Sequence, residues 1–316
     1  MSESTLYDLV IIGAGPAGIS AAIYASRALL TTVVLEQTSP GGQVLLTSEV
    51  DNYPGVPSTS GYELIQAMEN QAKDLGVTIH SAQVSSISST CDNNFIISCN
   101  GGTSYNAKAV ILASGSTPRK AGFEGEEDFI GRGISYCATC DGMFYRNKPV
   151  YVVGGGNSAA EEALFLTRFA SEVHMIIRKD HLRAQAALVD QLQQNEKVFV
   201  HFRTTISKVE GEDLLTKLYL HNEDTDEITC ISGDPGSFGV FVFVGQLPSS
   251  ELIKEFAELD QTGAVITDEY MATRTPGLYC AGDVRSKVLR QIITAASDGA
   301  VAATSVAGYL GQPIAG

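Results

Sequence analysis

The chain has 316 residues, of which 44% are hydrophobic and 18% charged, a composition typical of a folded protein with more than one domain. Its formal net charge of −15 argues against nucleic acid and against an anionic membrane surface as partners, because both require a basic face. The polar N-terminal segment and the lack of any run of 18 apolar residues predict neither a secretory leader nor a transmembrane helix. The expected location is therefore the cytoplasm.

The first element is a buried strand over residues 8–12, which leads into the glycine loop Gly13-Ala14-Gly15-Pro16-Ala17-Gly18. The alanine-rich segment 16–27 predicts a helix, and residues 32–35 predict a second strand. This G-x-G-x-x-G loop between a strand and a helix is typical of a dinucleotide-binding βαβ unit. Glu36 follows 18 residues after Gly18, where a carboxylate can accept hydrogen bonds from ribose hydroxyls. The unit is expected to hold the AMP half of FAD or NAD.

A second unit of the same kind is predicted from residue 150 onward. A strand over 150–153 precedes the loop Gly154-Gly155-Gly156-Asn157-Ser158-Ala159, a helix over 157–169 follows, and a strand covers 173–177. After that strand the sequence has Arg178, Lys179 and Arg183 where the first unit has Glu36. Cations at this place can pair with a 2′-phosphate, which favours NADPH over NADH.

The second unit is predicted to be inserted into the first. Apolar strands at 109–113 and 241–244 end in the glycine- and proline-containing stretches 114–118 and 245–248, which are candidate linkers. A third strand and turn over 278–283 then returns to the first fold, and a helical stretch over 292–309 follows. We expect an α/β protein with two Rossmann-like domains: an FAD domain of residues 1–117 and 247–316, and an NAD(P)H domain of residues 118–246 that carries the redox cysteines.

Cys137-Ala138-Thr139-Cys140-Asp141 stands just before the second loop. Two thiols at this spacing can cycle between dithiol and disulfide, and Asp141 could move a proton to or from the pair. No second Cys-x-x-Cys and no His-x₃₋₅-His accompanies them, so no metal site is predicted. The other cysteines, at 91, 99, 230 and 280, show no paired spacing, and Cys280 is expected in the core.

A further segment, Gly282-Asp283, ends the strand that begins at residue 278 and is followed by Arg290 and Gln291 before the last helix. A carboxylate at this place could bond the ribityl or pyrophosphate part of a flavin. The N-terminus of the following helix would stabilise negative charge on a reduced flavin.

Taken together, these segments resemble low-molecular-weight thioredoxin reductase over nearly the whole chain and in the same order. Cys137-Ala-Thr-Cys-Asp141 with flanking Tyr136 and Gly142 matches that family's redox signature. Residues 41–43, 52–55, 281–283 and 290–299 resemble its flavin-contacting segments. The resemblance implies that Cys140 faces the flavin, that Cys137 attacks the partner disulfide and that Asp141 is the general acid. It also implies a swinging NADPH domain with the two linkers as hinges, thioredoxin or a similar small redox protein as partner, and a homodimer.

The residues expected to bind FAD are Gly13, Gly15, Pro16, Ala17, Gly18, Glu36, Gln37, Gly42, Gln43, Asn52, Ala113, Gly115, Gly282, Asp283, Arg290, Gln291 and Ile292. The residues expected to bind NADP are Gly154, Gly156, Asn157, Ser158, Arg178, Lys179 and Arg183.

The sequence departs from the family in the NADPH signature, which begins His-Arg-Arg in relatives and Ile177-Arg178-Lys179 here. Lysine lacks the bidentate fork that arginine offers a phosphate, so NADH or ferredoxin stays open as the electron donor. A reductase for another thiol carrier and a dithiol oxidase that passes electrons to oxygen are alternatives of the same fold. A non-catalytic flavoprotein is disfavoured, because it would not need both cysteines and the second loop.

Overall fold

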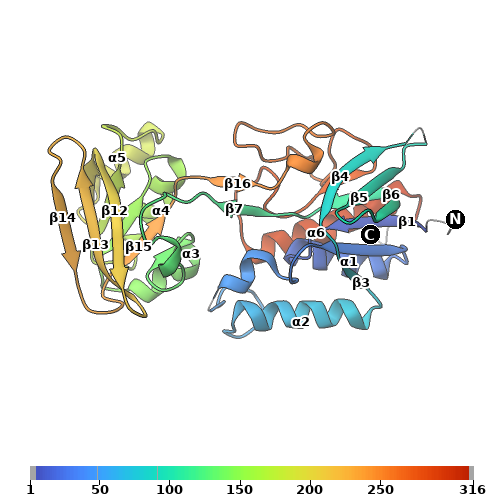
Figure 1. The fold of residues 1–316 in the computed structure, drawn as a ribbon, viewed down its shortest axis with the longest axis horizontal. Coiled ribbons are helices and arrows are strands. Elements are labelled where there is room, and N and C mark those ends of the chain that lie inside the picture. Colours follow the sequence, from blue (N-terminus) through green and yellow to red (C-terminus); the bar gives the residue numbers. More distant parts are fainter. Residues whose placement is uncertain (1–4, 48, 91, 313–316) are drawn as a thin grey trace. The chain divides into compact units, whose positions relative to one another are not determined.

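The structure is a computed structural model that describes residues 5–47, 49–90 and 92–312. Contacts divide the chain into two compact units (Figure 1). The first comprises Met1–Thr117 with Leu247–Gly316, and the second comprises Pro118–Gln246. Each unit is built on a sheet with parallel strands and helices packed on it, so the predicted α/β fold class is confirmed. No helix among the described residues is long and apolar enough to cross a membrane.

The first unit has a seven-stranded sheet in the order β3-β2-β1-β6-β5-β4, with β17 paired to the second half of β6. Strands β3, β2, β1, β6 and β17 are parallel, and β4 and β5 are antiparallel additions at one edge. The strands are β1 (Leu6–Ile12), β2 (Thr32–Glu36), β3 (Thr78–Ser81), β4 (Val84–Ser89), β5 (Phe95–Cys99), β6 (Ser104–Leu112) and β17 (Leu278–Cys280).

Helices α1 (Pro16–Arg27) and α6 (Ile292–Tyr309) pack closely together beside this sheet, and α2 (Gly61–Asp74) packs against α1. Gly299 allows the approach of α6, because a Cβ there would lie 2.0 Å from the Ala17 carbonyl oxygen. Leu9, Ile11 and the small side chains of the two helices form one fully buried core. Two 3₁₀ turns complete the unit, η1 (Gly42–Leu46) and η4 (Glu251–Ile253).

The second unit has a parallel five-stranded sheet in the order β11-β10-β9-β15-β8. A separate antiparallel sheet, β12-β13-β14, packs on one face, and α4 and α5 pack on the other. The elements are η2 (Glu127–Phe129), β8 (Ile134–Ser135), α3 (Ala138–Asp141), η3 (Gly142–Tyr145), β9 (Val150–Val153), α4 (Asn157–Leu166), β10 (Val173–Ile177), α5 (Ala186–Gln194), β11 (Val198–Phe202), β12 (Thr204–Gly211), β13 (Leu215–Asn222), β14 (Ile228–Ser232) and β15 (Gly239–Val242).

The chain passes between the units at β7 (Ser116–Pro118) and β16 (Gln246–Pro248), which pair with each other. Backbone bonds extend the pairing: Arg119 N–H donates to the Gly245 carbonyl, and Ser249 N–H donates to the Gly115 carbonyl, both at 3.0 Å. The two expected linkers therefore form one two-stranded ribbon.

Several expected boundaries shift. The helix expected to reach residue 169 ends at Leu166, because the next residues turn more tightly and the Thr167 hydroxyl donates to the Leu164 carbonyl at 2.7 Å. The expected strand at 241–244 runs instead over 239–242, and the turn at Gly245 has φ +123°. Cys280 is fully buried, as expected. Cys91 lies outside the described residues.

Candidate functional site

The three glycines of the first loop, between β1 and α1, differ in the space that a side chain would find at each position. Gly13 has φ +103°, and a Cβ there would meet the Ala113 carbonyl oxygen at 2.4 Å. A Cβ on Gly18 would lie 1.8 Å from the Gly13 carbonyl oxygen. A Cβ on Gly15, in contrast, would meet nothing within 4 Å. The fold requires the outer two glycines, whereas Gly15 leaves open space at the N-terminus of α1, where backbone N–H groups and the helix dipole favour a phosphate.

Glu36 is held beside this loop. Its Oε2 accepts a hydrogen bond from the Ala14 N–H at 2.8 Å, and its Oε1 accepts from the N–H and hydroxyl of Thr38 at 2.9 and 3.1 Å. The 41–43 segment approaches the same loop, since Gly41 N–H donates to the Ala14 carbonyl at 2.8 Å. A Cβ on Gly42 would lie 4.0 Å from the Gly15 Cα. The first loop, Glu36 and the 41–43 segment are separate in sequence but therefore lie next to one another.

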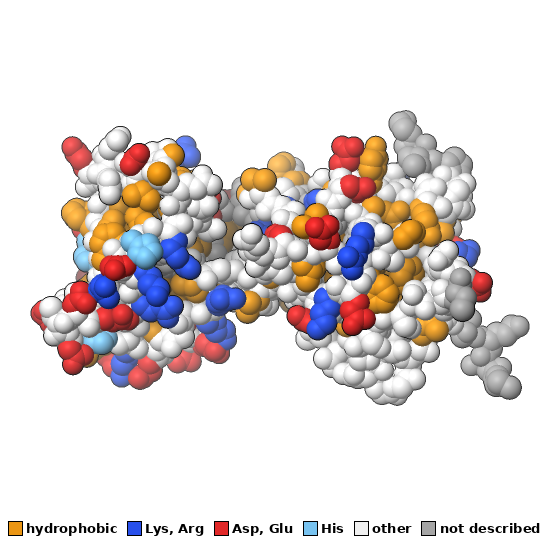
Figure 2. Space-filling view, turned by 90° about the horizontal axis from the view of Figure 1, so that it is seen from above, with side chains coloured by type: hydrophobic (Ala, Val, Ile, Leu, Met, Phe, Trp, Pro, Cys, Tyr) orange, Lys and Arg blue, Asp and Glu red, His pale blue; other side chains and the backbone are white. Residues whose placement is uncertain are grey.

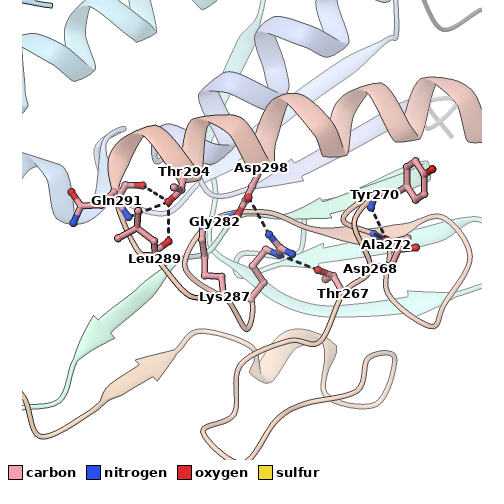
Figure 3. Close-up of polar contacts among 11 residues, drawn as sticks. Thr267, Asp268, Tyr270, Ala272, Gly282, Lys287, Leu289, Gln291, Thr294 and Asp298 are labelled. Atoms are coloured by element: carbon pink, nitrogen blue, oxygen red, sulfur yellow. Dashed lines mark hydrogen bonds and ion pairs between the residues drawn. The ribbon is translucent and has the colours of Figure 1, made fainter. Parts of the chain in front are cut away.

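The Gly282 turn is fixed by a buried ionic cluster that the sequence did not reveal. Asp298 of α6 accepts hydrogen bonds from the Gly282 N–H at 3.1 Å, from Arg285 Nη1 at 3.0 Å and from Lys287 Nζ at 2.8 Å (Figure 3). Arg285 Nε also donates to the Thr267 hydroxyl at 2.9 Å. All three charged side chains are at most 13% exposed. A cluster so desolvated holds the turn in one geometry.

Two buried polar atoms next to this cluster lack partners. Asp283 Oδ1 and Arg290 Nε are both buried, and neither has a hydrogen-bond partner in the described chain. Burial raises the pKa of the Asp283 carboxyl, although the charges of Lys287 and Arg290 oppose the shift. Buried polar atoms normally have hydrogen-bond partners in a native protein, so these two atoms fit a polar ligand bound beside them.

Gln291, a predicted FAD-binding residue at the start of α6, also contacts another predicted FAD-binding residue. The Asn52 amide donates to Gln291 Oε1 at 3.1 Å, although 239 positions separate the two residues. Gln291 caps α6, and its N–H donates to the Thr294 hydroxyl at 3.2 Å (Figure 3). Gly282 lies beside the first loop, because a Cβ there would be 2.9 Å from the Ala17 Cβ. The first loop, Glu36, the 282–283 turn and the start of α6 together fit a dinucleotide.

Replacing Asp283 with asparagine is expected to stabilise the cofactor-free protein but weaken flavin binding about 10-fold, because one charge-assisted hydrogen bond is lost. Since burial raises the pKa of Asp283, the folded form binds its proton more tightly than the unfolded form does. The parent apoprotein should therefore lose stability as the pH rises above about 4 through the raised pKa, and the variant should not show that loss. Melting temperatures between pH 4.5 and 8 test this.

The control for that variant is Asp298→Asn, which changes a carboxylate with three partners. It should destabilise the protein by about 3 kcal/mol or more, since it leaves two buried cations unpaired. If the melting temperatures of Asp283→Asn and the parent differ by the same amount at every pH, Asp283 does not cause the loss of stability with rising pH.

The second glycine loop, between β9 and α4, repeats the pattern of the first. Gly154 has φ +140°, and a Cβ there would meet the Phe243 carbonyl oxygen at 2.4 Å. A Cβ on Gly156 would meet nothing within 4 Å. Asn157 Oδ1 accepts from the Gln185 N–H at 2.8 Å, and Arg183 N–H donates to the Gly155 carbonyl at 2.7 Å. The basic segment is therefore tied to the loop by its backbone.

Three cations at the end of β10, Arg178, Lys179 and Arg183, have exposed side chains. Their acidic neighbour Asp180 is bound by the His181 ring at 2.6 Å and by Arg203 Nη2 at 3.1 Å. None of the three cations forms an ion pair with another described residue. Basic and acidic side chains lie intermixed on the face of this unit seen in Figure 2. The arrangement leaves the three cations available to a phosphate.

Ile177, the first residue of the 177–179 segment that departs from the expected NADPH signature, is 3% exposed. A Cβ on Gly155 would lie 3.2 Å from Ile177 Cγ2, so this side chain packs under the glycine loop. Its role is structural in the described chain.

Cys137 and Cys140 form a disulfide with a Cα–Cα distance of 5.3 Å. Cys137 precedes the short helix α3, and Asp141 N–H donates to the Cys137 carbonyl at 3.1 Å. Burial raises the pKa of Asp141, while a hydrogen bond with the Ser135 side chain opposes the shift. A carboxyl that is protonated more readily than usual beside a redox-active pair can donate a proton to a leaving thiolate.

Comparison with known proteins identifies the family. Residues 7–299 match the model of the pyridine nucleotide-disulphide oxidoreductases. The chain is 45% identical over 307 residues to the thioredoxin reductase of Treponema pallidum (strain Nichols), covering 97% of this chain and 98% of that one. The chain belongs to this family, within its thioredoxin reductases. The family implies a flavin and a nicotinamide cofactor.

Solved structures agree in fold. The thioredoxin reductase of Streptococcus pyogenes MGAS5005 matches with a TM-score of 0.91 and 40% identity, over 98% of this chain and all of that one. A ferredoxin-flavin thioredoxin reductase from Clostridium acetobutylicum matches with a TM-score of 0.53 and 29% identity, over 98% and 99% of the two chains. The resemblance to low-molecular-weight thioredoxin reductases is confirmed.

For some predicted site residues the structure gives no contact that favours binding. Gln37, Gln43 and Ser158 have exposed side chains, and Gly115 belongs to the connecting ribbon. Their roles stay predictions. Sequence reasoning missed Thr38, Ser135 and Asp298, which contact the predicted residues Glu36, Cys137 and Gly282. It also missed Arg285 and Lys287, which bind Asp298, and Arg203, which binds Asp180. Only Asp298 carried a signal, because it lies in the 290–299 segment that resembles the family.

Proposed function

We propose that this chain reduces the disulfide of thioredoxin with electrons from NADPH, through FAD in the first unit and the Cys137–Cys140 pair in the second. The observation that carries the proposal is the Cys137–Cys140 disulfide followed by the partly buried acid Asp141, in a chain whose relatives are thioredoxin reductases. When bound, the flavin supplies two-electron transfer between nicotinamide and disulfide. The protein is expected to act as a homodimer in the cytoplasm.

The Cys137–Cys140 pair passes electrons to the partner by thiol–disulfide exchange. The Cys137 thiolate attacks one sulfur of the partner disulfide, so that a mixed disulfide forms and the partner's own S–S bond breaks. Asp141 gives its proton to the thiolate that leaves. The Cys140 thiol then transfers its proton to Asp141, and the resulting thiolate attacks the Cys137 sulfur. The second partner thiolate leaves and takes that proton, the enzyme disulfide re-forms, and the partner has gained two electrons and two protons.

The neighbourhood of the pair also suits a protein partner. Met143 and Phe144 follow Asp141 closely and are 45% and 46% exposed. Exposed apolar side chains beside a redox-active pair offer a contact surface for a small protein. This supports thioredoxin or a similar carrier over a free small-molecule dithiol.

NADPH is proposed as the donor because Arg178, Lys179 and Arg183 are exposed while Arg203 and His181 bind Asp180. Replacing Arg178 with alanine should raise the KM for NADPH about 10-fold or more, since a charge-assisted hydrogen bond to phosphate is lost. The KM for NADH, which lacks the 2′-phosphate, should change less than about 2-fold.

Steady-state kinetics with both nucleotides measure this difference. Lys217→Ala on β13, where the lysine pairs with Glu210, is the control and should change neither constant. If Arg178→Ala raised the KM for NADPH and the KM for NADH equally, Arg178 would not bind the 2′-phosphate.

A further inference from the structure

Arg203 is the single residue between β11 and β12, and it lies beside the basic segment at the end of β10. Phe202, the last residue of β11, pairs in register with Ile177, so Arg203 follows one strand where Arg178 follows the other. The Arg203 N–H donates a hydrogen bond to the Lys179 carbonyl at 3.0 Å. The fold therefore fixes the Arg203 backbone against the segment that is expected to bind the 2′-phosphate.

Arg203 has a backbone conformation that is unusual for its residue type. Its φ of +50° lies in the left-handed region, which is unfavourable for a residue with a Cβ. The turn is held on its other side as well, because the Arg203 carbonyl accepts a hydrogen bond from the Glu223 N–H at 2.7 Å. Glycine or asparagine would adopt this conformation more readily, so local backbone preference does not favour an arginine here.

The Arg203 side chain binds two acidic residues. Its Nη2 donates to Asp180 Oδ2 at 3.1 Å, and its Nε lies 3.5 Å from Asp224 Oδ1. The other oxygen of Asp180, Oδ1, lies 2.6 Å from His181 Nδ1. The hydrogen bond with His181 above all, and the Arg203 charge after it, hold the pKa of Asp180 below its usual range. Asp180 is therefore ionised at neutral pH, and both of its oxygens are bound.

Asp180 is the one acidic residue in the basic segment 178–183, so the contacts of its carboxylate matter for a phosphate ligand. A carboxylate without partners at this place would pair with a neighbouring cation and would repel a phosphate dianion. The three cations of the segment form no ion pair with another described residue. Binding of Asp180 by Arg203 is therefore the contact that spares these cations from their own acidic neighbour.

We propose that Arg203 is a positioning residue that sets the preference for a nucleotide with a 2′-phosphate: its guanidinium holds the Asp180 carboxylate and so keeps the three cations of segment 178–183 unpaired. The inference rests on the proposed function, in which NADPH is the donor. Arg203 acts through Asp180 and needs no contact of its own with the nucleotide.

The test measures binding of 2′,5′-ADP and of 5′-AMP to the FAD-loaded holoprotein by calorimetry, without turnover. The two fragments differ only in the 2′-phosphate, so the ratio of their dissociation constants isolates recognition of that group. Arg203→Asn removes the charge and suits a positive φ. It should weaken 2′,5′-ADP binding about 5-fold at low ionic strength and change 5′-AMP binding less than about 2-fold, because exposed charges have modest effects that salt screens. Arg203→Gly, which also suits the turn, should give the same result.

Two further variants separate the role of Arg203 from a general loss of positive charge. Asp180→Asn should bind 2′,5′-ADP at least as tightly as the parent, and in this background Arg203→Asn should weaken binding less than about 2-fold. Lys208→Asn removes one positive charge from β12, where the lysine pairs with Glu124 and Glu210, and should leave the ratio of the two dissociation constants unchanged.

A ratio that Arg203→Asn does not change, or an equal loss of 2′,5′-ADP binding in the Asp180→Asn background, would overturn the role of Arg203 and leave NADPH as the proposed donor. A parent protein that binds 2′,5′-ADP no more tightly than 5′-AMP would instead contradict NADPH as the donor, and the role of Arg203 with it.

Discussion

Replacing Cys137 with serine should lower thioredoxin turnover about 10³-fold or more, because a neutral hydroxyl cannot replace the attacking thiolate. Reduction of the flavin by NADPH should continue, since that step does not need the partner-facing sulfur. Stopped-flow absorbance of the flavin and a thioredoxin assay on the same preparation separate the two steps.

The assignment of roles within the pair has its own test. Cys140→Ser should trap a covalent mixed disulfide with thioredoxin, because the thiol that resolves it is missing, whereas Cys137→Ser should trap none. Both products can be distinguished on a non-reducing gel. Cys230→Ser, at an exposed cysteine on β14, is the control and should keep full turnover. Trapping by Cys137→Ser and not by Cys140→Ser would reverse the two roles.

The matched variants Gly15→Val and Gly156→Val should separate the two nucleotide sites. Both glycines have extended backbones, with φ −74° and −93°, that valine can adopt, and a Cβ at either meets no protein atom within 4 Å. Both proteins should therefore fold. Each added side chain fills the space into which a pyrophosphate would fit, and the loss of two charge-assisted hydrogen bonds should weaken binding about 100-fold or more.

The two variants should differ in colour and in reactivity. Gly15→Val should be isolated without flavin, whereas Gly156→Val should stay yellow but fail to be bleached by NADPH. Each variant is the steric control of the other, and circular dichroism checks that both are folded. Loss of flavin from Gly156→Val with retention in Gly15→Val would exchange the cofactors of the two units.

Local sequence signals predicted the elements that carry the two loops. Helix α1 begins at Pro16 and ends at Arg27 as expected, because proline suits the first helical position and the alanine-rich segment favours a helix. Strands β9 and β10 and helix α6 also have the expected bounds. The sheet β12-β13-β14 was not predicted, since its strands alternate only weakly between buried and exposed positions.

The parts of the site that could not be predicted depend on contacts between distant residues. Asp298 binds Arg285 and Lys287 across a turn, and Asn52 meets Gln291 from the other end of the chain. Motifs gave the chemistry of the site, and tertiary packing decided which neighbours hold and tune it.

The most direct test of the electron path is an anaerobic titration of the purified holoprotein with NADPH, followed by flavin absorbance, with oxidised thioredoxin added afterwards. The account predicts prompt bleaching of the flavin, return of its colour when thioredoxin is added, and about two new thioredoxin thiols for each NADPH consumed. A flavin that neither NADPH nor NADH bleaches, but that reduced ferredoxin does, would contradict the account and show that the second nucleotide site does not supply the electrons.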